Sequence, residues 1–342
     1  MADPMTTTAP MLTTALSRLR GALRSRWLRV TVRLVVGLAV LLTVIVHVGT
    51  APLLTGILSI DLQTIVWALA LSAVATGAAA WRWRIVATRL GVDLSCGSAF
   101  GRYYQSQFLN TVIPGGIGGD VHRAVGHGQR AGSVAQSARA VALERTVGQV
   151  VQLSLSLIIC VFVGAQFMGL LISGVAVVLG IIVVGLAVAV LPFARGRAAA
   201  LREVRQLHAG LGSARALAQV VLASVIVISC HVVTFAIATA AIGVTVPPDQ
   251  LLVLALLVLL GSSIPFSIGG WGPREGIAGW AFAVVGFGAP AGVAASALFG
   301  VLTTIAVAPG AVVALVSAVR RRTTTRFEAG PVLIAKDLEV TP

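Results

Sequence analysis

The chain has 342 residues, of which 57 % are apolar and 11 % are charged, and its mean hydropathy is +0.98. A water-soluble surface needs about a quarter of charged residues, so the composition excludes a soluble globular protein. Several stretches without charge have about the 17–25 residues that a helix needs to cross the hydrocarbon core. They are uniformly apolar rather than alternating, so the predicted fold class is an all-α integral membrane protein.

The net charge of +14 is not distributed as in a nucleic-acid-binding protein. Such a protein gathers basic residues on one exposed face, commonly beside aromatic side chains that stack on bases. Here the Lys and Arg residues occur in short groups between apolar stretches, as in membrane proteins that follow the positive-inside rule. The sequence therefore predicts no nucleic-acid partner.

In chain order, a central membrane domain is flanked by two polar tails. Residues 1–29 are expected to be a basic cytoplasmic tail, residues 30–320 the polytopic membrane domain, and residues 321–342 a second cytoplasmic tail. The first apolar run is long for a signal peptide and ends without a small-residue cleavage site. About eight transmembrane helices are predicted, over residues 30–49, 60–80, 146–167, 170–192, 218–242, 249–264, 276–289 and 292–318.

The basic residues predict the orientation of these helices. All 25 Lys and Arg residues lie in the segments through Arg33, from 81 to 145 and from 193 to 217, at Arg274, or in the C-terminal tail. With eight crossings, all of these segments fall on one side of the membrane, which the positive-inside rule identifies as the cytoplasm. The alternate connections contain no basic residue and lie near residues 50–59, 168–171, 243–248 and 290.

The cytoplasmic segment between the second and third predicted helices has its own structure. Trp81 and Trp83 alternate with Arg82 and Arg84, which predicts an interfacial belt with arginines that snorkel to the membrane surface. Further on, three aromatic residues spaced by four indicate an interfacial helix over residues 98–110. A glycine-rich loop follows it, and since lipid cannot satisfy its backbone groups, we expect it to be re-entrant or interfacial and to face the protein interior.

This glycine-rich motif occurs twice. Residues 113–123 (IPGGIGGDVHR) align without gaps with residues 264–274 (IPFSIGGWGPR), and six of the eleven positions are identical. Two predicted crossings precede each motif and two follow it, so we expect two pseudo-repeated halves, each with a Gly-rich interrupted or re-entrant segment. The topology makes the halves parallel, but they are inverted if either motif region crosses the bilayer.

The repeated motif is the candidate substrate site. Paired glycines let an anion approach backbone N–H groups, and Arg123 and Arg274 could hold the same phosphate. The nearby carboxylates could receive an amine or polyol headgroup or carry a proton. In the alternative interpretation, the glycines serve helix packing and each arginine forms a structural bridge with a neighbouring acid. The candidate substrate-binding residues are Gly118, Gly119, Asp120, Arg123, Glu144, Arg145, Gly269, Gly270, Arg274 and Glu275.

Other polar residues give weaker indications. His231, in the middle of a predicted helix, is either a hydrogen-bonded core histidine or a proton relay. Cys96, Cys160 and Cys230 are far apart and are expected to be small core residues. No spacing of His, Cys, Asp and Glu suits a metal ion, so neither a metal nor another cofactor is predicted.

Three motifs together carry a family resemblance: PGGIGGDxxR at residues 114–123, ERxxG at residues 144–148, and PxSxGGxGxxE at residues 265–275. They resemble the signatures of the lysylphosphatidylglycerol synthase transmembrane-region family, a flippase-like domain that occurs fused to aminoacyl-phosphatidylglycerol synthases or alone. In fused proteins, the resemblance implies transfer of aminoacylated phospholipid from the inner to the outer leaflet. The short tail after the last predicted helix implies a stand-alone member without the soluble synthase domain.

We therefore expect a non-enzymatic lipid transporter in the plasma (inner) membrane of a prokaryote. Its expected substrate is a charged (amino)phospholipid or a polyprenyl-linked lipid, and a separate lipid-modifying enzyme is a candidate partner. Two alternatives stay open. A membrane glycosyltransferase would use the acids near the outside, Asp61 and Asp249, whereas a non-transporting scaffold for a cell-envelope enzyme would tolerate substitutions in the motifs.

Overall fold

The computed structural model describes residues 50–113, 116–129, 131–163, 212–263 and 270–317, together with residues 42, 46, 172, 176 and 180. Within these ranges the regular elements are helices, without a strand. A turn at residues 307–308 separates the last named helix from a further helical segment at residues 309–317. The named helices are α3 (Ala51–Leu58), α4 (Leu62–Arg89), α5 (Cys96–Val112), α6 (Gly118–Gly128), α7 (Val134–Val163), α10 (Ala214–Ala241), α11 (Pro248–Ser262), α12 (Pro273–Val284) and α13 (Ala289–Ala306).

Four helical segments are long and apolar enough to cross a membrane: α4, α7, α10 and the segment Ala289–Ser317, which contains α13. They confirm the all-α membrane fold class. Large apolar side chains such as Val66, Trp67 and Leu222 remain exposed along them, as lipid-facing residues do. The two tails and most of the predicted helices 30–49 and 170–192 lie outside the described residues, so the number of eight crossings stays a prediction.

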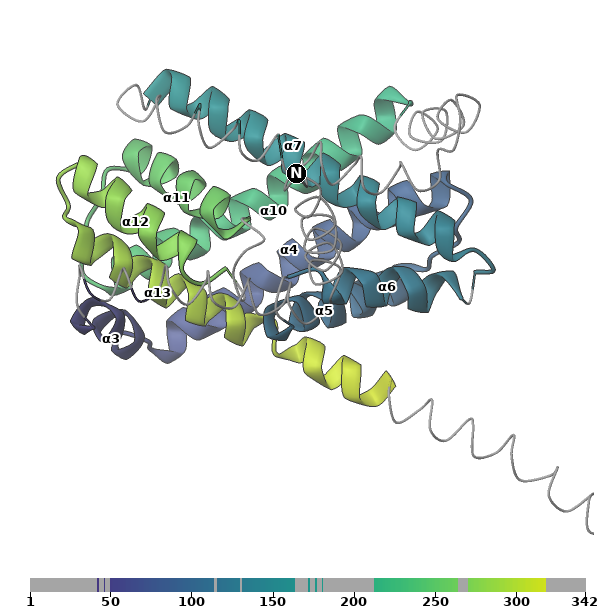
Figure 1. Cartoon of the computed structure of the whole chain (residues 1–342), viewed down its shortest axis with the longest axis horizontal. Coiled ribbons are helices and arrows are strands. Elements are labelled where there is room, and N and C mark those ends of the chain that lie inside the picture. Colours follow the sequence, from purple (N-terminus) through teal and green to yellow (C-terminus); the bar gives the residue numbers. More distant parts are fainter. Residues whose placement is uncertain are drawn as a thin grey trace, which may run out of the picture.

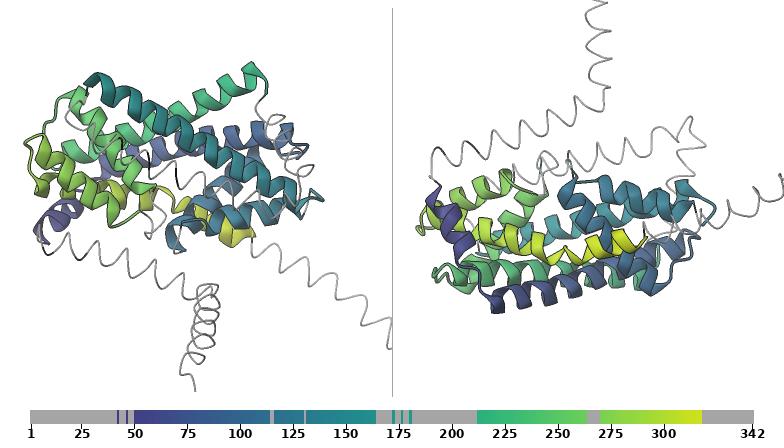
Figure 2. Two further views of the ribbon diagram at one scale, coloured as in Figure 1. Left: turned by 45° about the horizontal axis from the view of Figure 1, so that its top comes forward. Right: turned by 90° about the horizontal axis from the view of Figure 1, so that it is seen from below.

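The two long helices α4 and α10 lie side by side through the middle of the molecule (Figures 1 and 2). They are antiparallel: Arg82 of α4 donates to Ser224 of α10 at 2.9 Å, whereas Ala68, earlier in α4, lines one cavity with Thr234, later in α10. Around the opposite ends of this pair lie two apolar cores. One contains Phe235 and Phe282 with residues of α11 and α13, and the other contains Trp83 with residues of α5, α6 and α7.

The two halves contain matching helices in the same order. In each half, a long helix (α4 or α10) precedes two short helices that flank the glycine motif (α5 and α6, or α11 and α12), and a second long segment follows. The short helices pack against each other and have only 11 to 17 residues, whereas a crossing needs about 20. Since the matching helices α4 and α10 are antiparallel, the structure favours the inverted arrangement of the halves over the parallel one.

Several helix boundaries differ from the prediction because helices continue beyond their apolar stretches. The helix expected at 60–80 extends to Arg89, and the helix expected from 146 begins at Val134. The connection expected near 50–59 contains α3, and α6 begins inside the first glycine motif, at Gly118. Hydropathy alone detects the apolar part of a helix, so the polar extensions remained hidden.

The predicted interfacial belt is wrong. Trp83 is 0 % exposed and Arg82 is 6 % exposed, because α5, α6 and α7 cover this part of α4. The interfacial helix expected at 98–110 is confirmed as a helix, α5. It is more buried than expected, however: Tyr104 is 6 % exposed, although Phe100 is 39 % exposed.

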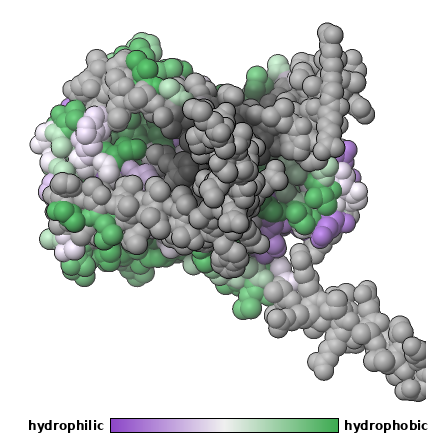
Figure 3. Space-filling model, viewed as in Figure 1, coloured by the Kyte–Doolittle hydropathy of each residue, from purple (hydrophilic) through white to green (hydrophobic). Residues whose placement is uncertain are grey.

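The charged ends of three long helices lie together at one end of the molecule. They are the end of α4 with Arg84 and Arg89, the start of α7 with Arg139, and the start of α10 with Arg215. Polar residues gather at the right-hand end of the space-filling view, where α6 and the first part of α7 lie, and apolar residues cover much of the left-hand part (Figure 3). This clustering fits a cytoplasmic membrane surface.

Asp61 has a structural role at the start of α4. Its Oδ1 accepts the backbone N–H of Thr64 at 2.8 Å, which caps the helix. Hydrogen bonds from Thr64, first from its side chain and then from its backbone, hold the pKa of Asp61 below its ordinary value. One of the two acids that the glycosyltransferase alternative would use is therefore explained by helix capping.

Candidate functional site

A buried polar cluster surrounds Glu144 of α7, whose side chain is 0 % exposed. Arg82 of α4 donates to its Oε1 from Nε at 3.0 Å and from Nη2 at 2.5 Å. The Tyr103 hydroxyl of α5 donates to the same oxygen at 3.0 Å, and Arg123 of α6 donates from Nη2 to Oε2 at 3.0 Å. Four helices thus converge on one carboxylate.

Asp120 of α6 supplies the second carboxylate. Its Oδ1 accepts from Arg123 Nη2 and from Arg145 Nη2, each at 3.0 Å. Ser106 and Asn110 of α5 also donate to Asp120, at 3.1 and 3.2 Å. Arg123 therefore bridges the two carboxylates, and the structure brings together four of the predicted site residues: Asp120, Arg123, Glu144 and Arg145.

We call Arg82, Asp120, Arg123, Glu144 and Arg145 the Arg123 cluster. Three guanidinium groups against two carboxylates give it a formal charge of +1. The Arg123 guanidinium lies 4.4 Å from the ring centroids of both Trp83 and Tyr103, and its buried Nε and Nη1 have no hydrogen-bond acceptor. The rings stabilise the cation but leave two donors unused.

The Arg123 cluster is enclosed on one side and open on the other. The side chains of Arg123 and Glu144 are both 0 % exposed, whereas those of Asp120 and Arg145 are 12 % and 43 % exposed. The ion pair between Asp120 and Arg145 is therefore the accessible edge of the cluster. Its Nε–Oδ2 distance is 2.9 Å.

Gly118 and Gly119 bring α6 close to α5. A Cβ on Gly119 would overlap the Ser106 carbonyl, and one on Gly118 would lie 2.9 Å from side-chain atoms of Ile113. The Gly119 N–H donates to Asn110 Oδ1 at 2.7 Å, so it is already satisfied within the protein. For these two glycines, the geometry favours the packing interpretation.

Sequence reasoning missed several members of this site. Arg82 was assigned to the membrane surface, although the glycine of the ERxxG motif indicates that a large side chain packs against it. Gly148 lies one turn after Glu144 on the same helix face, and a Cβ there would come within 2.8 Å of Arg82 Nη1. The other missed residues are Trp83, Tyr103, Ser106, Asn110 and Ser224.

The second motif forms a separate, electrically neutral cluster. Arg274 donates to Glu275 Oε1 from Nε at 2.9 Å and from Nη2 at 2.6 Å, and to Ser296 Oγ at 3.1 Å. Glu275 Oε2 accepts the Gly272 N–H at 2.6 Å, at the start of α12. The side chains of Arg274 and Glu275 are 2 % and 0 % exposed. This cluster joins α12 to α13 and is closed to solvent in this conformation.

The two clusters have the same arrangement of groups around their arginine, but they have no residue in common. Each motif arginine binds a carboxylate and lies beside two aromatic rings, which for Arg274 are Trp271 at 5.0 Å and Phe299 at 5.7 Å. Among the described residues Arg123 and Arg274 have no common partner, so the structure does not bring them together on one phosphate. Gly270 has a φ of +86°, which favours glycine, and Gly269 lies outside the described residues.

A comparison with known protein families identifies the family of the chain. The family model described as the lysylphosphatidylglycerol synthase TM region matches residues 30–310. The chain belongs to this family. It is thus a multi-pass membrane protein whose family is linked to lipid, as the resemblance implied. No curated protein and no solved structure matched the chain.

Proposed function

We propose that this protein moves a phosphate-bearing membrane lipid between leaflets and that the Arg123 cluster binds its headgroup. The observation that carries the proposal is the excess positive charge of the cluster, together with the two unused donors of Arg123. A buried polar group without a partner is costly. A phosphate would supply both the missing negative charge and the acceptors for the two nitrogens.

The exposed ion pair between Asp120 and Arg145 is the point at which the headgroup enters the Arg123 cluster. Arg145 is the most exposed arginine of the cluster, and the carboxylate that it binds is the outer one, Asp120. When Arg145 exchanges this carboxylate for a lipid phosphate, Asp120 still holds Arg123 in place. By the positive-inside rule this end of the bundle faces the cytoplasm, so loading takes place from the inner leaflet.

In this proposal the second motif has a supporting role. Arg274 and Glu275 neutralise each other and are enclosed, so they fix α12 against α13 rather than contact lipid. Substrate contact is assigned to Asp120, Arg123, Glu144 and Arg145. A separate enzyme of lipid modification would supply the cargo.

The test uses the full chain reconstituted in phosphatidylcholine vesicles that contain a fluorescent phosphatidylglycerol analogue. Dithionite quenching reports how fast the analogue changes leaflet. We expect Arg145→Gln to slow this movement about tenfold, which corresponds to the loss of one charged hydrogen bond. Arg215→Gln, at an exposed arginine outside the cluster, is the matched control and should stay near the wild-type rate.

Two results would contradict the proposal. Wild-type protein that moves the analogue no faster than empty vesicles do would favour a scaffold. Unchanged movement in Arg145→Gln would remove the Arg123 cluster as the headgroup site.

A further inference from the structure

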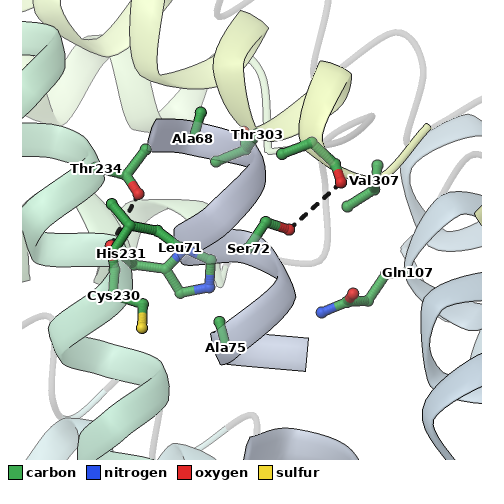
Figure 4. A pocket seen from close by; sticks show the side chains of 11 residues that line it. Ala68, Leu71, Ser72, Ala75, Gln107, Cys230, His231, Thr234, Thr303 and Val307 are labelled. Carbon is green, nitrogen blue, oxygen red and sulfur yellow. Dashed lines mark hydrogen bonds between the residues drawn. The ribbon is translucent and has the colours of Figure 1, made fainter. Parts of the chain in front are cut away.

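A small cavity lies between the two halves, away from both charged clusters (Figure 4). Its volume is about 40 Å³, and α4, α5, α10 and α13 all contribute to its wall. A buried water needs about 10–15 Å³, so the cavity has room for about three waters. Its polar lining residues are Ser72, Gln107, Cys230, His231, Thr234 and Thr303.

The lining can hold water. The hydroxyls of Ser72, Thr234 and Thr303 donate to backbone carbonyls of Ala306, Cys230 and Phe299, which leaves lone pairs on their oxygens as acceptors. The His231 ring points into the same space as these side chains (Figure 4). An imidazole can both donate to and accept from water, so it completes a hydrated site inside the bundle.

His231 and the Cys230 thiol are the titratable groups of the cavity lining; α4, α5 and α13 contribute none to it. Beyond the lining, Phe299 separates His231 from the second cluster. Its ring centroid lies 6.3 Å from that of His231 and 5.7 Å from the guanidinium carbon of Arg274, which is paired with Glu275.

On the other side, α10 connects His231 to the Arg123 cluster. Arg82 binds Ser224, seven residues before His231, which is two helical turns or about 10 Å along the axis. Of the other helices packed on α10, α7 carries Arg139, Glu144 and Arg145 in its first half, and α11 carries Asp249 in its first turn. The imidazole thus lies between the two clusters.

We propose that this cavity is a hydrated proton-binding site whose acceptor is the His231 imidazole, and that it couples proton uptake to the lipid movement of the proposed function. An imidazole nitrogen takes a proton from hydronium in the cavity, which leaves water, and returns it to water later. The positive charge of the Arg123 cluster opposes this protonation until a lipid phosphate neutralises the cluster. Binding of phosphate and of the proton therefore favour each other reciprocally.

The first half of the proposal is tested without lipid transport. The full chain with ¹⁵N-labelled histidine in phosphatidylcholine nanodiscs gives five imidazole signals, assigned by single His→Gln replacements. We expect the His231 signal to exchange magnetisation with water and to titrate between about pH 5 and about pH 8. A His231 signal that contacts no water, or that does not titrate in this range, overturns the proton site.

The second half is tested by the pH profile of the vesicle assay. Because the proton and the phosphate favour each other's binding, we expect the wild-type rate to be about tenfold higher at about pH 5.5 than at about pH 8. The rate of His231→Gln should be the same at both pH values. His208→Gln, at a histidine outside both motifs, is the control and should keep the wild-type profile. A purely structural His231 would instead lower the rate of its variant by the same factor at every pH, and that result overturns the coupling.

The outcomes separate the two proposals. If the wild type moves lipid and His231→Gln keeps its pH profile, the coupling fails and the proposed function stands. If the wild type moves no lipid at any pH, the proposed function and the coupling both fail, while the imidazole titration still decides on the proton site.

Discussion

Each buried arginine of the two motifs is held by a carboxylate and by aromatic rings, and glycines leave the space that guanidinium groups need. A Cβ on Gly300 would overlap the Arg274 guanidinium, as one on Gly148 would crowd that of Arg82. Arginine suits such sites because its planar cation binds carboxylates through two nitrogens and stacks on rings. The feature common to the two sites is geometric: the glycine and the arginine that it accommodates lie on different helices.

At the same scale, the second cluster predicts a large stability effect. Glu275→Gln removes the negative charge next to Arg274 and leaves a buried cation without its counter-charge. We expect it to destabilise the protein by about 3–5 kcal/mol. The measurement is the thermal unfolding transition of the purified protein in nanodiscs, followed by intrinsic tryptophan fluorescence.

The control for this prediction is the double variant Arg274→Met with Glu275→Gln. It leaves neither charge unpaired, so it should be more stable than Glu275→Gln alone. A single variant as stable as the wild type would show that Arg274 finds another counter-charge, and it would remove the structural role assigned to this pair.

At the scale of elements, glycines set the distances between helices. A Cβ on Gly119 would overlap the Ser106 carbonyl of α5, and one on Gly292 would overlap the Ala278 carbonyl of α12. Both halves therefore bring a helix backbone directly against its neighbour, the contact that small residues allow in membrane helices. In the first half this contact positions Asp120, the residue after Gly119, against Ser106 and Asn110.

We expect Gly119→Ala to separate α6 from α5, because the obstacle is backbone and cannot turn away. The variant should lower stability by about 1–3 kcal/mol and should also slow lipid movement, since Asp120 shifts with α6. Gly97→Ala is the matched control: it lies in the first turn of α5 with no atom near its added Cβ. Equal stability and equal lipid movement in the two variants would contradict the close-packing argument.

The elements show where sequence reasoning succeeds. Apolar length predicted the spans in α4, α7, α10 and α13, because hydrocarbon demands uniformly apolar helices. It failed for the polar extension of α7 before residue 146, which packs on α6 rather than on lipid. Motif reasoning found Asp120, Arg123, Glu144 and Arg145 but not Arg82 or Tyr103, since contacts between distant helices leave no periodic trace in the sequence.

For the whole molecule, the inverted halves give the two motifs equivalent places around the antiparallel pair α4 and α10. The small cavity borders both of these helices, so a movement of one half against the other would change its shape. Inverted repeats with interrupted segments are a recurrent architecture of secondary transporters. In the proposed function, the charge of the first cluster and the neutrality of the second determine which end binds the headgroup.

The orientation of this architecture predicts which side of the membrane exposes Cys96. This residue is exposed at the start of α5, at the end of the molecule where the charged ends of α4, α7 and α10 meet. By the positive-inside rule we expect that end to face the cytoplasm. In the variant Cys160→Ala with Cys230→Ala, a membrane-impermeant maleimide should therefore label inside-out vesicles and not right-side-out vesicles.

A variant that also carries Cys96→Ala has none of the three cysteines of the chain and sets the background of this measurement. Because the Arg123 cluster joins α4 and α7 and also reaches Ser224 of α10, the side that labels is, in the proposed function, also the side from which a headgroup reaches Arg145. Labelling from the outside would place the Arg123 cluster at the outer leaflet. The direction of loading would then reverse, although the chemistry of the cluster would be unchanged.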